Sequence, residues 1–141
     1  MSKIFINNIK VDIEAIDENN HVNNVVYVQW MQDVAILHSA AQGWSQEQYL
    51  NAGTGWVAKS HFIQYRSPAF LNDDIIVYTW VSTMSALNSV RKYKFIRKTD
   101  SKVIVEAETD WVFVNIKTGR PIRISEPVKK SFQIVSIDQE P

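Results

Sequence analysis

The densest polar segment of the chain is DENNHVNN, residues 17–24, which combines acidic, amide and imidazole side chains. It separates a stretch typical of a β-strand from a stretch typical of a helix. The first N–H groups of a helix lack partners within the helix and lie at the positive end of its dipole. Directed at a reacting carbonyl group, they would stabilise the oxyanion that forms on attack. Asp17 is close enough in sequence to reach the same point, as a base that activates water or as a nucleophile.

The same residues also fit a purely structural role. Asp and Asn before a helix commonly form turns and N-caps. Asp17 could simply begin an Asx-turn, and His21 could bond a backbone carbonyl group. The spacing alone leaves both interpretations open.

The composition restricts the class of protein. A chain of 141 residues is the size of one domain and can bury a core without disulfides. The 15 Lys and Arg residues balance the 15 Asp and Glu residues, so the net charge gives no field to recruit nucleic acid or an anionic membrane. The absence of cysteine excludes thiolate nucleophiles and Cys-based metal sites.

No segment suggests targeting or a division into domains. The N-terminus lacks the apolar core of a secretory signal, and no apolar run is long enough to span a bilayer. We therefore expect a cytoplasmic protein with no nucleic-acid partner and no membrane insertion. One domain is predicted over residues 1–137, followed by a C-terminal tail, residues 138–141.

One long helix follows the polar segment. Apolar residues at spacings of three or four predict a helix with one buried stripe, formed by Val22, Val26, Trp30, Val34, Leu37 and Ala41. Asn23 or Asn24 can cap its start, and Gly43 marks its end. Ser45 and Gln48 have the spacing of a capping box, which predicts a short helix over residues 45–51.

The rest of the chain is typical of β-strands, predicted at residues 3–16, 56–66, 75–83, 90–98, 102–116 and 131–137. If residues 99–101 form a hairpin loop, Lys94 lies opposite Glu106 and Lys92 opposite Glu108, so that charges of opposite sign face each other. The same register pairs Tyr93 with Ala107 and Phe95 with Val105, and a one-residue slip destroys both matches. We predict an α+β domain in which an antiparallel sheet of about five strands wraps around the helix.

The sequence resembles a known superfamily over most of its length. DENNHVNNVVY, residues 17–27, is similar to the motif of the 4-hydroxybenzoyl-CoA thioesterase-like hotdog superfamily, in the HVNN form of acyl-ACP thioesterases and related acyl-CoA thioesterases. YRSPA at residues 65–69 with NDD at 72–74, and WVFVN at 111–115 with TGRP at 118–121 and Ile124, resemble its later motifs in the right order.

The resemblance implies a hotdog fold, a curved sheet around a long central helix, and a homodimer, sometimes a tetramer, with sites at the subunit interface. It implies that Asp17 is the catalytic carboxylate and that Asn24 presents the N–H that polarises the substrate carbonyl. Asn19 and His21 match the additional polar residues of the acyl-ACP type. The substrate would be an acyl-CoA or an acyl-carrier thioester, and no cofactor is needed beyond the CoA of the substrate.

Two positions depart from the family pattern. Asn20 stands where a glycine is frequent, and Ser67-Pro68-Ala69 stands where the acyl-ACP enzymes carry a glutamate. The incomplete polar network favours an acyl-CoA mechanism centred on Asp17.

Other residues are candidates for substrate binding. Arg91 and Lys129 lie in basic regions where related enzymes hold CoA phosphates, although charged strand faces are usually only solvated. Tyr27 and Trp30 could limit the size of the acyl group, although core packing is their default role. We expect no metal, because no His, Asp and Glu set has ligand spacing, and no serine nucleophile, because no Gly-x-Ser-x-Gly motif occurs.

The sequence therefore predicts an acyl-CoA thioesterase that acts on a fatty or aromatic acyl group. Two alternatives remain: a hotdog protein that binds acyl thioesters without turnover, and a hotdog hydratase or dehydratase.

Overall fold

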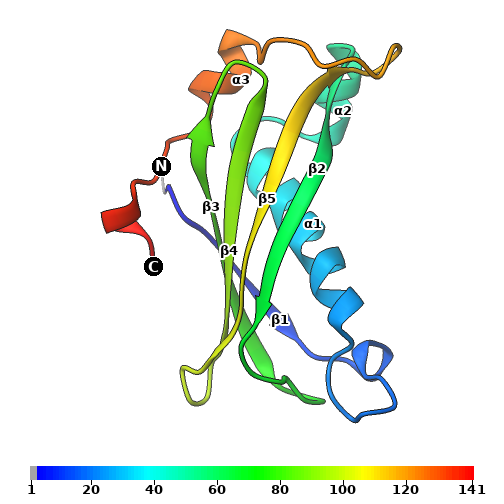
Figure 1. Cartoon of the computed structure of the whole chain (residues 1–141), viewed down its shortest axis with the longest axis vertical. Helices are drawn as coiled ribbons and strands as arrows, with labels where there is room; N and C mark the ends of the chain where they lie inside the picture. The colour runs from blue at the N-terminus through cyan, green and yellow to red at the C-terminus, as the bar shows by residue number, and fades with distance from the viewer. Residues whose placement is uncertain (1–2) are drawn as a thin grey trace.

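A single long helix lies against one face of a twisted antiparallel sheet in the computed structural model, which describes residues 3–141 (Figure 1). The helices are α1 (Asn24–Ala41), α2 (Gln46–Asn51) and α3 (Glu126–Lys130). The strands are β1 (Phe5–Lys10), β2 (Thr54–Tyr65), β3 (Asp74–Met84), β4 (Asn88–Arg97) and β5 (Val103–Asn115). Short 3-10 turns cover Ile13–Ala15 and Ile137–Gln139. The predicted α+β class, with one long helix on a five-stranded sheet, is confirmed.

The sheet has the order β1-β3-β4-β5-β2, with every neighbouring pair antiparallel. The predicted hairpin register is confirmed, since Lys92 lies opposite Glu108 and Lys94 opposite Glu106. The charges nevertheless pair elsewhere: Lys92 Nζ lies 2.8 Å from Glu140 and Arg66 lies 3.1 Å from Glu106. The register thus agrees with the apolar alternation, whereas the charged side chains on the outer face have other partners.

The ends of α1 follow the predicted capping chemistry. The side chain of Asn23 accepts a hydrogen bond from Val25 N at 3.0 Å, which makes Asn23 the N-cap rather than Asn24. Gly43 has a φ of +96°, a left-handed conformation that ends the helical path. The capping box between Ser45 and Gln48 starts α2, as predicted.

The predicted buried stripe of α1 is confirmed in its first half, where Val22 and Val34 are buried and Val26 and Trp30 pack against the core, but it is wrong in its second half. The helix buries Tyr27, Met31, Val34, Ala35, His38 and Ser39, whereas Leu37 is 46 % exposed and Ala41 is exposed. The helix carries apolar residues around much of its circumference, so the apolar pattern fits more than one face. Tertiary packing chose a face that includes a histidine.

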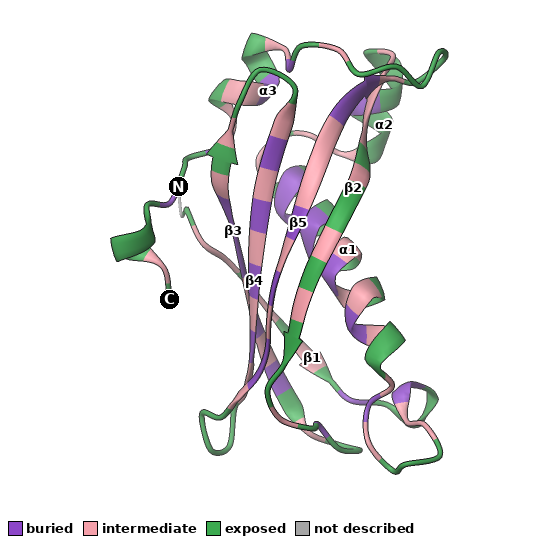
Figure 2. Cartoon of the chain, viewed as in Figure 1, coloured by how far each residue is buried: buried purple, intermediate pink, exposed green. Residues whose placement is uncertain are grey.

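The core has two parts, and Figure 2 shows its buried residues along α1 and the strands. The larger one lies between α1 and the sheet and includes Met31, Val34, Val77, Phe95 and Val105, all less than 1 % exposed. The second part lies toward α2 and α3 and is formed by Tyr49, Val81, Phe113, Ile124, Val128 and Phe132. The molecule is therefore packed most tightly along the middle of α1, and each end carries loops.

The ends of the chain differ from the prediction. The strand expected over residues 3–16 is limited to β1, because the Asp12 side chain caps a 3-10 turn at Ile13. The strand expected over residues 131–137 is wrong: α3 precedes this segment and only Ile134 forms a bridge, with Val81. Pro127 in the first turn favours the start of α3, a signal that the strand pattern obscured. Residues 138–141 lie against the outer face of the sheet, where Lys94 donates to Pro141 O at 3.0 Å.

Replacing Asn23 with Ala should lower the free energy of unfolding by about 1 kcal/mol, because Val25 N loses its acceptor at the start of α1. Asn23→Ser should keep most of the stability. Denaturant unfolding at equilibrium measures both, and Asn24→Ala, at an exposed side chain, is the control. A loss as large for Asn24→Ala as for Asn23→Ala would contradict the capping assignment.

Candidate active site

The segment from Asp17 to His21 forms a closed loop at the start of α1. Asp17 N donates to His21 O and Asn20 N donates to Asp17 O, both at 3.0 Å, while Ile16 and Val22 form a bridge at its base. Asn20 has a φ of +66°, in the left-handed region that asparagine and glycine tolerate best. The loop therefore accepts Asn20 at the position where the resembling family often has glycine.

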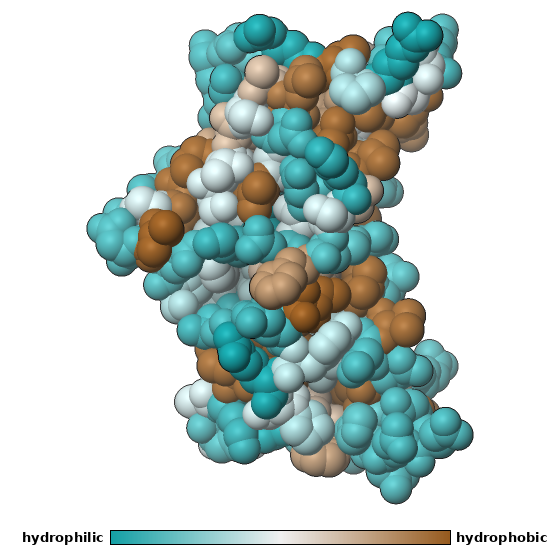
Figure 3. All heavy atoms as spheres, viewed as in Figure 1, coloured by the Kyte–Doolittle hydropathy of each residue, from teal (hydrophilic) through white to brown (hydrophobic). Residues whose placement is uncertain are grey.

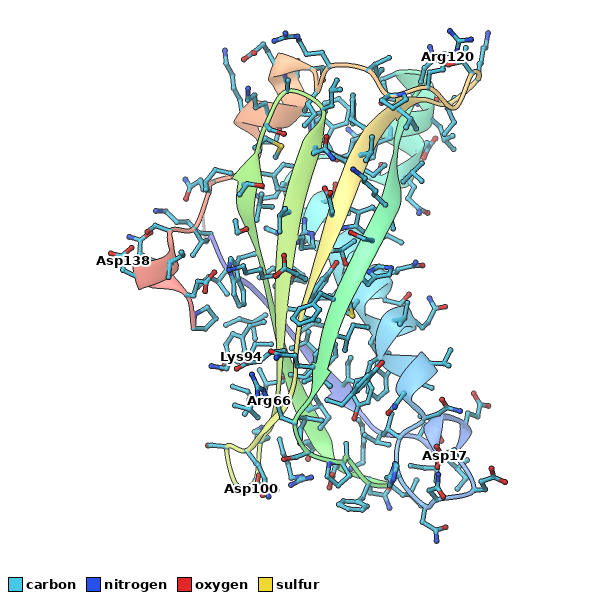
Figure 4. The ribbon with its side chains drawn as sticks, in the orientation of Figure 1. Asp17, Arg66, Lys94, Asp100, Arg120 and Asp138 are labelled. Atoms are coloured by element: carbon cyan, nitrogen blue, oxygen red, sulfur yellow. The ribbon has the colours of Figure 1, made fainter. Side chains whose placement is uncertain are left out.

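The carboxylate of Asp17 is only partly used by this loop. Its Oδ1 accepts from Asn19 N at 2.9 Å, which is the Asx-turn expected from the structural alternative. Within residues 3–141, Oδ2 accepts no hydrogen bond. The side chain is half-buried and lies at the end of the molecule where α1 begins (Figure 4). One oxygen thus fixes the orientation of the group and leaves the other available for chemistry.

The tip of α1 leaves one N–H group open. Val25 N and Val26 N bond the side chain and the carbonyl of Asn23, at 3.0 and 2.9 Å, and Asn23 N donates to Ala15 O at 2.9 Å. Asn24 N has no acceptor in the described part of the chain. This is the N–H that the resemblance assigns to carbonyl polarisation, and the cap leaves it at the positive end of the helix.

The connection between β2 and β3 braces the Asp17 loop. Val22 N donates to Ala69 O at 2.9 Å, and Asp73 in turn bonds Phe70 N at 2.9 Å and Arg97 at 3.0 Å. The hydroxyl of Tyr65 donates to Asn24 O at 3.2 Å. Neither Tyr65 nor Arg97 was predicted as a positioning residue. The signal for Tyr65 was the YRSPA motif, which indicated family resemblance and not contacts, whereas Arg97 lies outside both motifs and only its partner Asp73 belongs to NDD.

The remaining residues of the motif have simpler surroundings. His21 Nδ1 lies 3.4 Å from Val22 O, and Asn19 is exposed in the same loop. Tyr27 is 2 % exposed and packs on Trp30 and Phe95, with ring centroids 5.4 and 5.6 Å apart, and burial raises its pKa. Asn19 and His21 therefore lie in the loop with Asp17, and Asn24 begins α1 after it, whereas Tyr27 and Trp30 lie along the core.

The two basic candidates lie away from Asp17. Arg91 is buried beneath α1, where Nη1 lies 2.8 Å from His38 Nδ1 and 3.1 Å from Thr79 Oγ1. Lys129 is on α3, at the end of the molecule opposite the Asp17 loop (Figures 1 and 4). Within one chain, the structure does not bring either cation to the carboxylate.

A cavity of about 590 Å³ lies between the second half of α1, α2 and the sheet. Its lining includes Ile36, Trp44, Trp56, Trp111 and Arg91, but no residue of the Asp17 loop. The sequence analysis did not foresee this cavity, because residues from α1, α2 and four strands form it jointly.

Within residues 3–141, no three side chains of His, Cys, Asp or Glu are placed to hold a metal ion. None of the helices formed by these residues is long and apolar enough to cross a membrane.

Comparison with known families supplies the context for this geometry. A family model described as the thioesterase-like superfamily matches residues 11–132, which is most of the chain and includes the Asp17 loop. The chain belongs to the thioesterase-like superfamily. A search of curated proteins found no sequence match.

Solved structures agree with this family at the level of the fold. The 1,4-dihydroxy-2-naphthoyl-CoA thioesterase of Synechocystis is 15 % identical, with a TM-score of 0.83 over 91 % of this chain and 94 % of that one. A Staphylococcus aureus protein, SAV2348, solved in complex with CoA, is 20 % identical, with a TM-score of 0.85 over 91 % and 80 % of the two chains. The DHNA-CoA thioesterase of Staphylococcus aureus is 21 % identical, with a TM-score of 0.80 over 85 % and 80 %. The predicted hotdog fold is confirmed.

The buried His38 predicts a pH dependence of stability. Burial, aided by the charge of Arg91, lowers the pKa of His38 to about 3. In the unfolded chain the imidazole pKa is about 6.5, so below that pH the unfolded state binds a proton that the folded state does not. Stability should therefore fall by about 2 kcal/mol between pH 7 and pH 5.

Unfolding of the native protein and of His38→Gln across this pH range measures the effect. Gln keeps an acceptor for Arg91 but does not titrate. Between pH 7 and pH 5 the free energy of unfolding of the variant should therefore fall by about 2 kcal/mol less than that of the native protein. An equal loss in both proteins would show that His38 is not its source.

Proposed function

We propose that this protein is an acyl-CoA thioesterase. Asp17 either activates water or attacks the thioester carbon itself, and the N–H of Asn24 stabilises the oxyanion. One observation carries the proposal: Asp17 Oδ2 and Asn24 N both lack partners in residues 3–141, and the hydrogen-bonded loop that holds Asp17 leads directly into the first turn of α1, where Asn24 lies. Membership of the thioesterase-like superfamily supports the reaction class.

The reaction follows from these two groups. As a base, Asp17 removes a proton from water, whose oxygen forms a bond to the thioester carbon. The carbonyl oxygen then carries the negative charge, which the N–H of Asn24 stabilises. Collapse of this intermediate breaks the C–S bond, the thiolate takes the proton held by Asp17, and the acid and the CoA thiol are released. As a nucleophile, Asp17 would instead displace the CoA thiolate and form a mixed anhydride that water hydrolyses. Water attack on the Asp17 carbonyl of the anhydride would place ¹⁸O in Asp17 after a single turnover in H₂¹⁸O, which the general-base route does not do.

The choice of CoA as carrier has independent support. Several similar folds belong to proteins named as acyl-CoA thioesterases, and one was solved with CoA bound. The sequence also lacks the glutamate of the acyl-ACP type at Ser67-Pro68-Ala69. An acyl-CoA is therefore the substrate proposed first, with an acyl-carrier thioester as its alternative.

We further propose that the site is completed in a homodimer through β2. This strand is the longer free edge of the sheet, with 12 residues against 6 in β1. Its Val57 and Phe62 are 51 % and 59 % exposed, and hydrophobic side chains reach the surface along this edge (Figure 3). A long, apolar, unpaired edge favours pairing with a second strand.

Antiparallel pairing of two β2 strands would also join the two halves of a site. Thr54, at the start of β2, lines the cavity, whereas Tyr65, at its end, contacts Asn24 at the tip of α1. Such pairing places the end of one β2 beside the start of the other. The Asp17 loop of one protomer would then approach the cavity of its partner, which supplies room for an acyl group.

Asp17→Asn should lower thioester hydrolysis by about 10²- to 10⁴-fold, because the amide neither takes a proton nor attacks carbon at a useful rate. Thiol release from a panel of aliphatic and aromatic acyl-CoAs measures turnover, and calorimetry measures substrate binding. Glu18→Gln is the matched control, since Glu18 is an exposed neighbouring carboxylate.

The same assay separates the alternatives. Binding of acyl-CoA by the native protein without thiol release would favour a binding protein. Double-bond hydration or formation without thiol release would favour a lyase. Full activity in Asp17→Asn would exclude the proposed mechanism.

The double variant Val57→Lys with Phe62→Lys should be monomeric and poorly active, because charges on the β2 edge oppose strand pairing. Light scattering after size-exclusion chromatography measures the mass. Ile6→Lys, on the opposite edge at a residue that is 55 % exposed, should remain dimeric. A native protein that is monomeric and active at nanomolar concentration would contradict the shared site.

A further inference from the structure

The cavity beside α2 combines an apolar wall with a charged base. Its volume of about 590 Å³ lies within the range of about 300–1,000 Å³ that is typical of small-molecule sites. The wall is mainly aromatic and aliphatic, with Ile36, Trp44, Leu50, Trp56, Met84 and Phe132. Arg91 of β4 also lines it, although its residue surface is only 6 % exposed.

The guanidinium of Arg91 has no anionic partner in the described part of the chain. Its Nη1 contacts His38 Nδ1 and Thr79 Oγ1, at 2.8 and 3.1 Å, and Nε and Nη2 have no acceptor among residues 3–141. Burial lowers the pKa of Arg91, and the side chains that oppose this shift are Tyr93 and Tyr49, with no carboxylate among them.

The neighbouring histidine does not neutralise this charge. His38 accepts from Arg91 as an uncharged imidazole, since burial lowers its pKa to about 3. Charged side chains are almost never fully buried unless an opposite charge or a metal pairs with them. Residues 3–141 supply no such group to Arg91, so the open side of the guanidinium, toward the cavity, is where an anion would complete it.

A second donor lacks an acceptor beside the same cavity. The indole Nε1 of Trp111 is buried without a hydrogen-bond partner. It approaches the Tyr93 hydroxyl, which donates to Thr109 Oγ1 at 3.0 Å, but does not reach hydrogen-bond geometry. Two side chains on adjacent strands that line this cavity, one cationic and one neutral, therefore carry donors that lack acceptors among residues 3–141.

We infer that this cavity binds the carboxylate of an organic acid with an apolar body, and that Arg91 anchors the carboxylate. The planar guanidinium suits a two-oxygen anion, and the aromatic wall suits an alkyl or aryl chain. The wall disfavours the hydrophilic phosphates of CoA, the ligand that the sequence suggested for Arg91. This inference concerns binding and stands whether or not the chain hydrolyses thioesters.

Titration of the native protein with three decyl compounds at pH 7.5 tests the inference. Calorimetry measures affinity, and the fluorescence of Trp44, Trp56 and Trp111, which line the cavity, reports occupancy. Decanoate should bind at least about tenfold more tightly than decanol, although decanol is the more apolar compound. Decylamine should bind weakest because its charge repels Arg91. Equal or tighter binding of decanol would overturn the inference.

Two variants test whether Arg91 is the residue that recognises the negative charge of the ligand. Arg91→Met keeps an apolar side chain of similar length and should reduce the preference for decanoate over decanol to about twofold or less. Its thermal stability should be equal or higher, because an unpaired buried charge is removed. Arg120→Met, at an exposed arginine, should retain the native preference. A native preference in Arg91→Met would overturn the role of Arg91.

Trp111→Phe gives a second variant that does not depend on the folding of Arg91→Met. Loss of the indole N–H should weaken the binding of decanoate and leave the affinity for decanol unchanged. Equal weakening of both ligands would indicate a packing effect and contradict a polar role for Trp111.

Hydrolysis assays distinguish two sources of the carboxylate, the far end of the acyl group and a separate acid. These assays, unlike the binding titrations, rest on the proposed function. If the anion is the far end of the acyl group, ω-carboxydecanoyl-CoA should have a higher kcat/KM than decanoyl-CoA, and Arg91→Met should remove this advantage. If the anion is a separate acid, decanoate should change the rate on decanoyl-CoA and the two substrates should behave alike. Absence of all hydrolysis would contradict the proposed function alone, because the binding titrations decide this inference independently.

Discussion

The start of α1 imposes the constraint on which the site depends, because a helix begins with N–H groups that its own carbonyl groups cannot satisfy. Asn23 satisfies Val25 with its side chain and Val26 with its carbonyl, and leaves Asn24 N open. The Asp17 loop is closed by its own backbone bonds and tied to the β2–β3 connection through Val22. The open donor and the free carboxylate oxygen are therefore held by backbone geometry, which favours a preorganised site.

The length of α1 separates the two functional regions of the chain. Its 18 residues correspond to about 27 Å at the rise of an α-helix. The Asp17 loop lies at one end of this helix, and the cavity begins at the middle of the helix with Gln32. One protomer therefore has the reactive group without the large cavity beside it. In the proposed dimer through β2, antiparallel pairing reverses one protomer relative to the other. The reactive group of one protomer would then lie near the cavity of its partner.

The face of the sheet beneath α1 contains a layer of polar side chains as well as the apolar core. Thr79, Arg91, Tyr93 and Thr109 are buried there, and His61 Nδ1 lies 2.8 Å from Thr109 Oγ1. Such groups weaken a core unless they are satisfied. Most of this layer is bonded internally, so the exceptions stand out: the open side of Arg91 and the indole of Trp111 both border the cavity. Unsatisfied polarity at one place, in an otherwise satisfied layer, is typical of a ligand site.

Local chemistry determined much of this protein from the sequence alone. Capping residues fixed the starts of α1 and α2, Gly43 fixed the end of α1, and alternation fixed the β4–β5 register to the residue, because each depends on neighbours in sequence or on one partner strand. The polar motif likewise predicted the turn that Asp17 forms with Asn19 before α1.

Only the tertiary structure decided which face is buried in the second half of α1, that residues 131–137 form no strand after α3, and where Arg91 lies. Apolar residues surround much of α1, so the pattern allowed several rotations, and packing against the sheet selected the one that buries His38. The cavity and the unpaired charge at its base arise where α1, α2 and the strands meet. No single segment carries a signal for them, because a cavity is the space that several elements leave between them and not a property of any one of them.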